Sequence, residues 1–263
     1  MGPLGRLSAA AAARAHELEN RSAELRDRGR DAPAAPSFSA SLRRGDVAVI
    51  AEVKRRSPSK GVINATIDAA AQASAYARGG AAALSILTEP SEFGGSIEDL
   101  TDARTATSLP TLKKDFHVHP IQVLEARAAG ASAMLLIARA LPPDTLRAMA
   151  DRAGDLGIEV LVEVRSEWEL EHALLIDDAV IGVNSRNLET LVIEPAVTSR
   201  LIPLIPTSRL AIAESGVSTR VDVERAAGVG ADAVLVGSTV SASADPALAV
   251  AALTGVARKR RDG

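Results

Sequence analysis

From residue 47 onward the chain repeats one pattern, a short apolar segment of strand character followed by a stretch of helical character. The apolar segments are VAVIAEVK, AAALSIL, LPTLKK, SAMLLIA, IEVLVEV, AVIGVN, RLAIAES and DAVLVGS, and they recur about every 20 to 30 residues. The stretches between them carry helix signals, such as the paired glycines that end TIDAAAQASAYARGG. This alternation predicts right-handed βαβ units, and eight units in about 210 residues predict an α/β fold, a (β/α)8 TIM barrel.

A doubly wound open sheet is the alternative architecture for alternating strands and helices. It would normally carry a glycine-rich dinucleotide-binding sequence after its first strand, where this chain has KRRSPSKG. Aromatic residues make up only 2% of the chain, so its core must be built from alanine, valine, leucine and isoleucine. That composition suits helices packed on a parallel sheet, and it favours the barrel.

Residues 1–46 differ from the repeating region. They are rich in alanine, arginine and glutamate and then in proline and serine, which predicts a leading helix and a loose connector. The expected organisation is an N-terminal helical extension and connector over residues 1–46 and a (β/α)8 barrel catalytic domain over residues 47–263.

Composition argues against several classes of protein. The net charge is -3, so we expect neither a nucleic-acid surface nor a membrane surface. The absence of cysteine excludes disulfides and a thiol nucleophile, and no apolar run or signal peptide predicts membrane insertion or export. His117 and His119 have no evident third ligand beside them, so we predict no metal site there. We expect a cytoplasmic monomer that binds a small molecule.

Five of the eight predicted strands end in a polar or ionisable residue. Alternation in VAVIAEVK places Ile50 in the barrel interior and Glu52 and Lys54 at its rim. The third strand directs Lys114 inward and Lys113 outward. Because TIM barrels carry catalytic groups at the carboxyl ends of their strands, we predict that these side chains meet in one site. The remaining polar strand ends are Glu163, Asn184 and Glu214.

Lysine is rare and unevenly placed. The chain has 25 arginines and five lysines, yet four of the lysines lie at the end of the first and third strands or in the loops that follow. Unlike arginine, a lysine amine can transfer a proton near neutral pH when burial and a neighbouring cation lower its pKa. We therefore predict proton transfer by Lys54 or Lys114, with Glu52 and Glu163 as acid/base carboxylates beside them. An ion-pair network that only stabilises the barrel is the alternative.

Glycine-containing turns follow the seventh and eighth strands, where TIM barrels often bind phosphate on backbone amides. AESG and VGS place Gly216, Gly237 and Ser238 in these turns, and Arg56 and Ser57 lie in the loop across the barrel mouth. Together these residues predict a phosphate site.

Two of the three phenylalanines lie in loops rather than in core segments. Phe93 follows the second strand and Phe116 follows the third. They are placed to wall a flat, apolar part of a substrate, with simple packing of the loops as the alternative.

With these residues assembled, the sequence resembles the indole-3-glycerol phosphate synthase family. The matching strings, in family order and at family spacing, are IAEVKRRSPSKG, SILTEPSEFGGS, LKKDF, LVEV, GVNSRNL, IAESGV and VLVGS, all within residues 48–238. The resemblance implies ring closure of 1-(2-carboxyphenylamino)-1-deoxyribulose 5-phosphate with loss of carbon dioxide and then water. This is a carboxy-lyase reaction of tryptophan biosynthesis that needs no metal and no redox cofactor.

The resemblance also implies roles by position. Lys114 corresponds to the general acid that protonates the substrate carbonyl, and Glu163 to an acid/base carboxylate. Lys54 matches a second catalytic lysine, which binds the substrate carboxylate and assists dehydration. Glu52 matches a glutamate that orients this lysine or takes a proton. Asn184 completes the catalytic set. The matched substrate-binding residues are Ser57, Arg186, Glu214, Ser215, Phe93 and Phe116, and the matched phosphate-binding residues are Ser57, Gly216, Gly237 and Ser238.

Some positions depart from the family pattern. Ser185 stands where the family commonly has a second asparagine, GSTVSAS replaces the usual continuation after the phosphate glycine, and the N-terminal segment matches weakly.

Two other functions are alternatives for a barrel of this kind. One is a sugar-phosphate isomerase similar to phosphoribosylanthranilate isomerase, whose family uses a thiol that this chain lacks. The other is a non-catalytic barrel that binds phosphate ligands, which would not need Lys54, Lys114 and Glu163 together.

Overall fold

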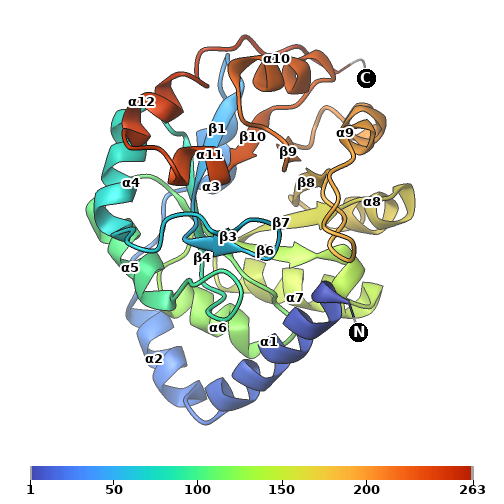
Figure 1. Cartoon of the computed structure of the whole chain (residues 1–263). Helices are drawn as coiled ribbons and strands as arrows, with labels where there is room; N and C mark the ends of the chain where they lie inside the picture. The colour runs from blue at the N-terminus through green and yellow to red at the C-terminus, as the bar shows by residue number, and fades with distance from the viewer. Residues whose placement is uncertain (1, 262–263) are drawn as a thin grey trace.

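The strands of the repeating region close into a barrel. The computed structural model describes residues 2–261, and within them eight parallel strands pair in the closed order β1-β10-β9-β8-β7-β6-β5-β4 (Figure 1). The predicted (β/α)8 barrel is therefore confirmed, and each predicted apolar segment contains one strand. The bounds are β1 Ala48–Val53, β4 Ala83–Leu87, β5 Thr111–Lys114, β6 Ala133–Ile137, β7 Glu159–Val164, β8 Val180–Asn184, β9 Ala211–Glu214 and β10 Ala233–Val236.

Helices cover the outside of the barrel (Figure 1). Polar side chains fix the first residue of several of these helices. Ser96 and Asp99 form a capping box at the start of α5 (Ile97–Ala106), and Thr219 and Asp222 form another at the start of α10 (Arg220–Gly228). A short antiparallel pair, β2 Arg56–Ser57 and β3 Gly61–Val62, lies in the loop after β1. The helices are α4 Ala69–Arg78, α5 Ile97–Ala106, α6 Ile121–Ala128, η1 Ala138–Ala140, α7 Pro143–Asp155, α8 Glu167–Leu174, α9 Pro195–Leu201, η2 Ile202–Leu204, α10 Arg220–Gly228, α11 Ser238–Ser241 and α12 Pro246–Ala251.

The strand side chains divide into two buried layers. Val49, Ala51 and Val53 pack among the surrounding helices, whereas Ala48 and Ile50 belong to the barrel interior. This is the alternation predicted for β1. Because side chains alternate along every strand, the last inward residue of a strand faces the mouth of the barrel.

The N-terminal extension differs from the expected single helix and loose connector. Its described part contains three helices, α1 Pro3–Glu19, α2 Ser22–Asp31 and α3 Phe38–Leu42. Glu159, at the start of β7, accepts hydrogen bonds of 2.8 Å from Ser37 Oγ and from the next two backbone N–H groups, which fixes the first turn of α3. Phe38 and Leu42 are fully buried and close the amino-terminal end of the barrel interior.

The first helix lies at the opposite end of the barrel. Leu4, Leu7 and Ala11 of α1 belong to the same interior cluster as Phe116, which follows β5. Figure 1 shows α1 in dark blue along the barrel rim, next to α6. Among the helices that the structure describes, none combines the length and hydropathy needed to span a bilayer.

Candidate active site

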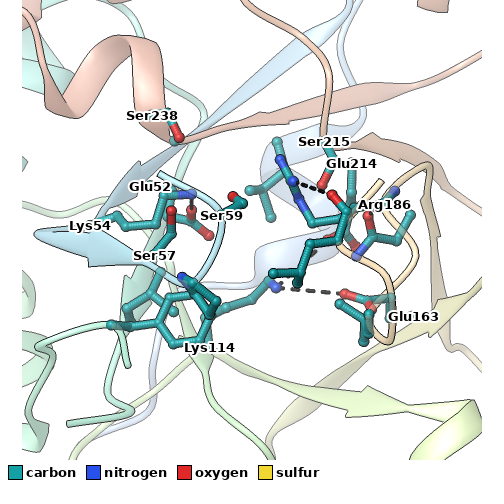
Figure 2. A pocket seen from close by; sticks show the side chains of 18 of the residues that line it. Glu52, Lys54, Ser57, Ser59, Lys114, Glu163, Arg186, Glu214, Ser215 and Ser238 are labelled. Carbon is teal, nitrogen blue, oxygen red and sulfur yellow. Dashed lines mark hydrogen bonds and ion pairs between the residues drawn. The ribbon is translucent and has the colours of Figure 1, made fainter. Parts of the chain in front are cut away.

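One cavity opens at the carboxyl ends of the barrel strands (Figure 2). Its lining comes from the ends of all eight barrel strands and the loops that follow them, together with the start of α1, and it includes every predicted site residue except Arg56. These residues are Glu52, Lys54, Ser57, Phe93, Lys114, Phe116, Glu163, Asn184, Arg186, Glu214, Ser215, Gly216, Gly237 and Ser238.

Glu52 and Lys54 form an ion pair at the end of β1. Lys54 Nζ lies 2.5 Å from Glu52 Oε1, and Ser85 Oγ donates a 3.3 Å hydrogen bond to Glu52 Oε2. Burial alone would raise the pKa of Glu52, but the charges of Lys54 and Lys114 outweigh it and hold that pKa below its ordinary value. Gly237 makes room for the pair, because a Cβ there would lie 2.3 Å from Glu52 Oε1. Glu52 is therefore a carboxylate at neutral pH.

Lys114 reaches into the centre of the cavity from the end of β5 (Figure 2). Its Nζ lies 3.6 Å from Glu163 Oε2 and 3.8 Å from Glu214 Oε2. The sequence predicts that burial lowers the pKa of this amine. Burial does act in that direction, but the three surrounding carboxylates, Glu52 included, outweigh it and raise the pKa of Lys114. The expectation is wrong in sign: Lys114 is an ammonium ion at neutral pH, suited to donate a proton.

Glu214 is buried with one oxygen unpaired. It is 2% exposed, and its Oε1 has no hydrogen-bond partner among residues 2–261. Burial, followed by the negative charge of Glu163, raises the pKa of Glu214 to about 8, so this carboxyl carries a proton at neutral pH. In the adjacent strand β8, Gly182 makes space for it, because a Cβ there would lie 2.0 Å from Oε1.

The loop after β8 is ordered by its own polar residues. Asn184 Oδ1 accepts a 2.9 Å hydrogen bond from the backbone N–H of Arg186. The guanidinium of Arg186 in turn donates from Nη1 to the carbonyl oxygen of Leu191 at 2.8 Å. Arg186 and Asn184 are thereby both held in the cavity wall.

The chain leaves β9 through a tight turn. Ser215 has a φ of 64° and Gly216 a φ of 76°, which explains why glycine suits the second position. The hydroxyl of Ser185 donates to the carbonyl oxygens of Glu214 and Ser215 at 3.1 and 3.0 Å. Ser185, where the chain departs from the family pattern, therefore stabilises this turn from behind and does not line the cavity.

The two glycine turns and the loop after β1 contribute to the same cavity. Gly216, Gly237 and Ser238 line it together with Ser57. Backbone N–H groups in such turns, with two hydroxyl groups nearby, form a surface suited to an anion.

The two arginines after Lys54 do not reach the cavity. Arg55 pairs with Asp99 through hydrogen bonds of 2.5 and 2.7 Å, away from the barrel mouth. Arg56 is exposed and is not among the lining residues, although its backbone N–H donates to the carbonyl oxygen of Phe93. The expected contribution of Arg56 to an anion site is therefore wrong in this structure.

Apolar side chains line another part of the cavity. The rings of Phe93 and Phe116 lie 6.3 Å apart between centroids and are tilted by 40°. Further lining residues went unrecognised in the sequence, namely Pro3, Leu4 and Leu7 of α1 and Leu188, Leu191 and Ile193 after β8. The apolar spacing of Leu4 and Leu7 marks a buried helix face, but not which part of the barrel it covers.

Histidines do not form a metal site. His117 is buried, with Nδ1 2.6 Å from the carbonyl oxygen of Leu135 and Nε2 3.0 Å from Lys113 Nζ. Burial and the charge of Lys113 lower the pKa of His117 well below its ordinary value. His119 lies elsewhere, 3.5 Å from Glu19. Within residues 2–261, no group of three or more His, Asp or Glu side chains is arranged to hold a metal ion.

Comparison with known proteins decides the family. A family model described as indole-3-glycerol phosphate synthase matches residues 5–253. The chain belongs to the indole-3-glycerol phosphate synthase family. The indole-3-glycerol phosphate synthase of Mycolicibacterium gilvum is 48% identical over 231 residues, covering 88% of this chain and 85% of that protein. The indole-3-glycerol phosphate synthase of a Nocardioides species is 51% identical over 208 residues, covering 79% of this chain and 80% of that protein.

Solved structures bear on the fold alone. The thiamine phosphate pyrophosphorylase of Pyrococcus furiosus superposes with a TM-score of 0.57 at 16% identity, covering 80% of this chain and 94% of that one.

The family model and the relatives confirm the resemblance seen in the sequence motifs as membership of the indole-3-glycerol phosphate synthase family. The cavity at the carboxyl ends of the strands is therefore the candidate active site.

Proposed function

We propose that this cavity binds 1-(2-carboxyphenylamino)-1-deoxyribulose 5-phosphate and that Lys114 initiates its conversion to indole-3-glycerol phosphate. The carboxy-lyase activity in tryptophan biosynthesis follows from family membership, which also decides against the isomerase and the non-catalytic alternatives. The observation that carries the assignment to Lys114 is its ammonium group, held among the side chains of three glutamates in a cavity that also presents two aromatic rings and glycine turns.

Ring closure requires the substrate carbonyl to accept electrons. As the ring carbon that bears the carboxylate attacks the carbonyl carbon, Lys114 donates a proton to the carbonyl oxygen. Carbon dioxide then leaves with its bonding electrons returned to the ring, which restores aromaticity. Lys54 holds the carboxylate until that step, and Glu52, 2.5 Å away, orients Lys54.

Dehydration requires a second pair of proton transfers. The new hydroxyl leaves as water once it is protonated, and a proton is lost from the neighbouring part of the five-membered ring. Lys114 is a neutral amine after ring closure and regains a proton from solvent water. Glu163, 3.6 Å from Lys114 Nζ, is placed to take a proton from the restored ammonium and deliver it to the leaving hydroxyl. Glu52, a carboxylate at neutral pH, accepts the other proton. Asn184 assists by holding the reacting part of the substrate.

The rest of the cavity binds and orients the substrate. The phosphate is assigned to Ser57 and to the turns at Gly216, Gly237 and Ser238, where backbone amides are available. The aminobenzoate ring is assigned to the wall of Phe93 and Phe116. The sugar hydroxyls are assigned to the remaining polar residues, Arg186, Glu214 and Ser215.

The chain is further proposed to act as a cytoplasmic monomer, with residues 1–46 an extension of a barrel domain over residues 47–263.

The test uses the purified chain and the carboxyphenylamino-deoxyribulose phosphate, with indole fluorescence as the readout. The parent protein is expected to form indole, and Lys114→Ala to lose almost all turnover while still folding. No indole signal from the parent, or equal rates from both proteins, would overturn the assignment.

A further inference from the structure

Arg14, near the middle of α1, lies between two buried carboxylates. Its Nη2 donates a 2.7 Å hydrogen bond to Asp115 Oδ1, and its Nη1 lies 3.5 Å from Glu89 Oε1. Glu89 is fully buried and Asp115 is 5% exposed, whereas Arg14 is half-buried. Carboxylates so far from water need a cation or several hydrogen bonds to stay charged, and Arg14 serves both of them at once.

Glu89 organises the loop that follows β4. Its two oxygens accept hydrogen bonds from the backbone N–H groups of Ser91, Glu92 and Phe93, at 3.0, 2.7 and 3.1 Å. The conformation of this loop, and with it the position of the Phe93 ring, therefore depends on where the Glu89 carboxylate is held.

Asp115 organises the corresponding loop after β5. It directly follows Lys114, and its Oδ1 accepts the backbone N–H of Phe116 at 2.7 Å. Its Oδ2 accepts a 2.8 Å hydrogen bond from Thr88 Oγ1, which joins the two loops. Removal of Arg14 would leave this Thr88 link intact, so the strand ends are expected to keep their places.

The helix that carries Arg14 is itself part of the cavity. Leu4 and Leu7, two to three turns before Arg14 in α1, line the cavity, and both belong to the interior cluster that contains Phe116. Arg14 thus connects three pieces, namely the helix that covers the apolar part of the cavity and the two loops that form its aromatic wall.

We propose that Arg14 is a positioning residue for the aromatic part of the substrate: by bridging Glu89 and Asp115 it holds α1, Phe93 and Phe116 in one arrangement. The proposal rests on the function proposed above, because it takes the Phe93 and Phe116 wall as the site of the aminobenzoate ring. Arg14 is not among the residues that line the cavity, and its guanidinium is engaged with Asp115 and Glu89, so it is assigned no proton transfer. Loss of Arg14 should therefore weaken binding at one end of the cavity and leave the other end and the chemistry largely unchanged.

The test compares Arg14→Met, which keeps the aliphatic stem, with Arg14→Lys, which keeps the charge but cannot bridge two carboxylates through a planar fork. Arg30→Met is the matched control, because Arg30 is an exposed cation of the same N-terminal extension that pairs only with Asp27 and Asp31 of its own helix in the described part of the chain. Steady-state rates give KM and kcat, and 2-aminobenzoate and inorganic phosphate serve as inhibitors that probe the two ends of the cavity separately.

For Arg14→Met we expect KM and the inhibition constant of 2-aminobenzoate to rise about tenfold, with kcat lowered less than about threefold. The inhibition constant of inorganic phosphate should stay at the parent value, and Arg14→Lys should recover part of the loss. A general loosening of the fold would instead raise the inhibition constants of 2-aminobenzoate and inorganic phosphate together, and this result would overturn the proposal. Parent-like KM and inhibition constants in Arg14→Met would overturn it as well. If Arg14→Met does not fold, parent-like inhibition of Arg14→Lys by 2-aminobenzoate would overturn it in the same way. A parent protein without turnover would refute the proposed function instead.

Discussion

Replacement of Gly182 by alanine tests whether the position of Glu214 matters for turnover. The added Cβ would lie 2.0 Å from Glu214 Oε1, whereas ordinary contacts begin near 3.4 Å, so the carboxyl group must retreat by about 1.4 Å. Its other oxygen lies 3.8 Å from Lys114 Nζ and would move with it. A misplacement of about 1 Å in an active site can cost roughly 100-fold in rate, so we expect kcat/KM to fall by roughly that factor. Overpacking should also lower the free energy of unfolding by about 1–3 kcal/mol.

Initial rates of indole formation and urea unfolding measure the two effects. Gly154→Ala is the control, because no heavy atom lies within 4 Å of a Cβ built at Gly154 in α7, and its rate should match that of the parent. If the Gly182 effect acts through Glu214, then Gly182→Ala combined with Glu214→Gln should be little worse than Glu214→Gln alone. If Gly182→Ala keeps more than about half of the parent rate, the position of Glu214 does not matter for turnover, because a shift of that size should cost far more.

Other predictions concern charge, pH and stability. Lys54→Arg keeps the positive charge but removes the amine that lies 2.5 Å from Glu52. We expect kcat to fall about 100-fold and KM to change by less than about threefold. A kcat near the parent value would show that Lys54 contributes only its charge. The pKa of Glu214 is raised from 4.5 to about 8, so the folded state holds a proton that the unfolded state has released, and stability should fall as pH rises through that interval. Urea unfolding at several pH values should show that slope in the parent and a smaller one in Glu214→Gln; equal slopes would contradict the raised pKa. Arg261 pairs with buried Asp232 at 2.9 Å, and Arg258 pairs with the same carboxylate. Arg261→Met should lower the free energy of unfolding by about 3 kcal/mol and leave kcat unchanged. An unchanged denaturation midpoint would show that Arg258 alone is enough to stabilise the charge of Asp232.

The barrel and its site follow from short-range rules that a sequence displays directly. The two-residue period places Glu52 and Lys54 on one side of β1, and it separates Lys113 from Lys114 at the end of β5. Because all parallel strands of a barrel end at the same rim, residues far apart in the chain could be assigned to one site without knowing any distance. This is why the predicted site residues, apart from Arg56, line one cavity.

The environment of a charged group depends on several chain segments at once, and here the sequence was less informative. Lys114 was expected to have a lowered pKa, but carboxylates from β1, β7 and β9 raise it. Lys113 does point outward, yet it is fully buried, with Glu125 2.9 Å from its Nζ. Neither the surplus of negative charge at Lys114 nor the partner of Lys113 can be read from neighbours in the chain.

The N-terminal extension shows the same limit for packing. The apolar spacing of Leu4, Leu7 and Ala11 predicts a buried face of α1 but does not say that the face covers the mouth of the barrel. A helix beginning at Phe38 was missed because its first turn is held by Glu159, more than a hundred residues away in the chain.

The carboxyl carbon of the substrate offers the most direct test of the proposed reaction. With substrate labelled in the benzoate carboxylate, the protein is expected to release one labelled carbon dioxide for each indole formed, and Lys114→Arg to release it at least about 1,000-fold more slowly. Label retained in the product, or release by Lys114→Arg at the parent rate, would contradict the account.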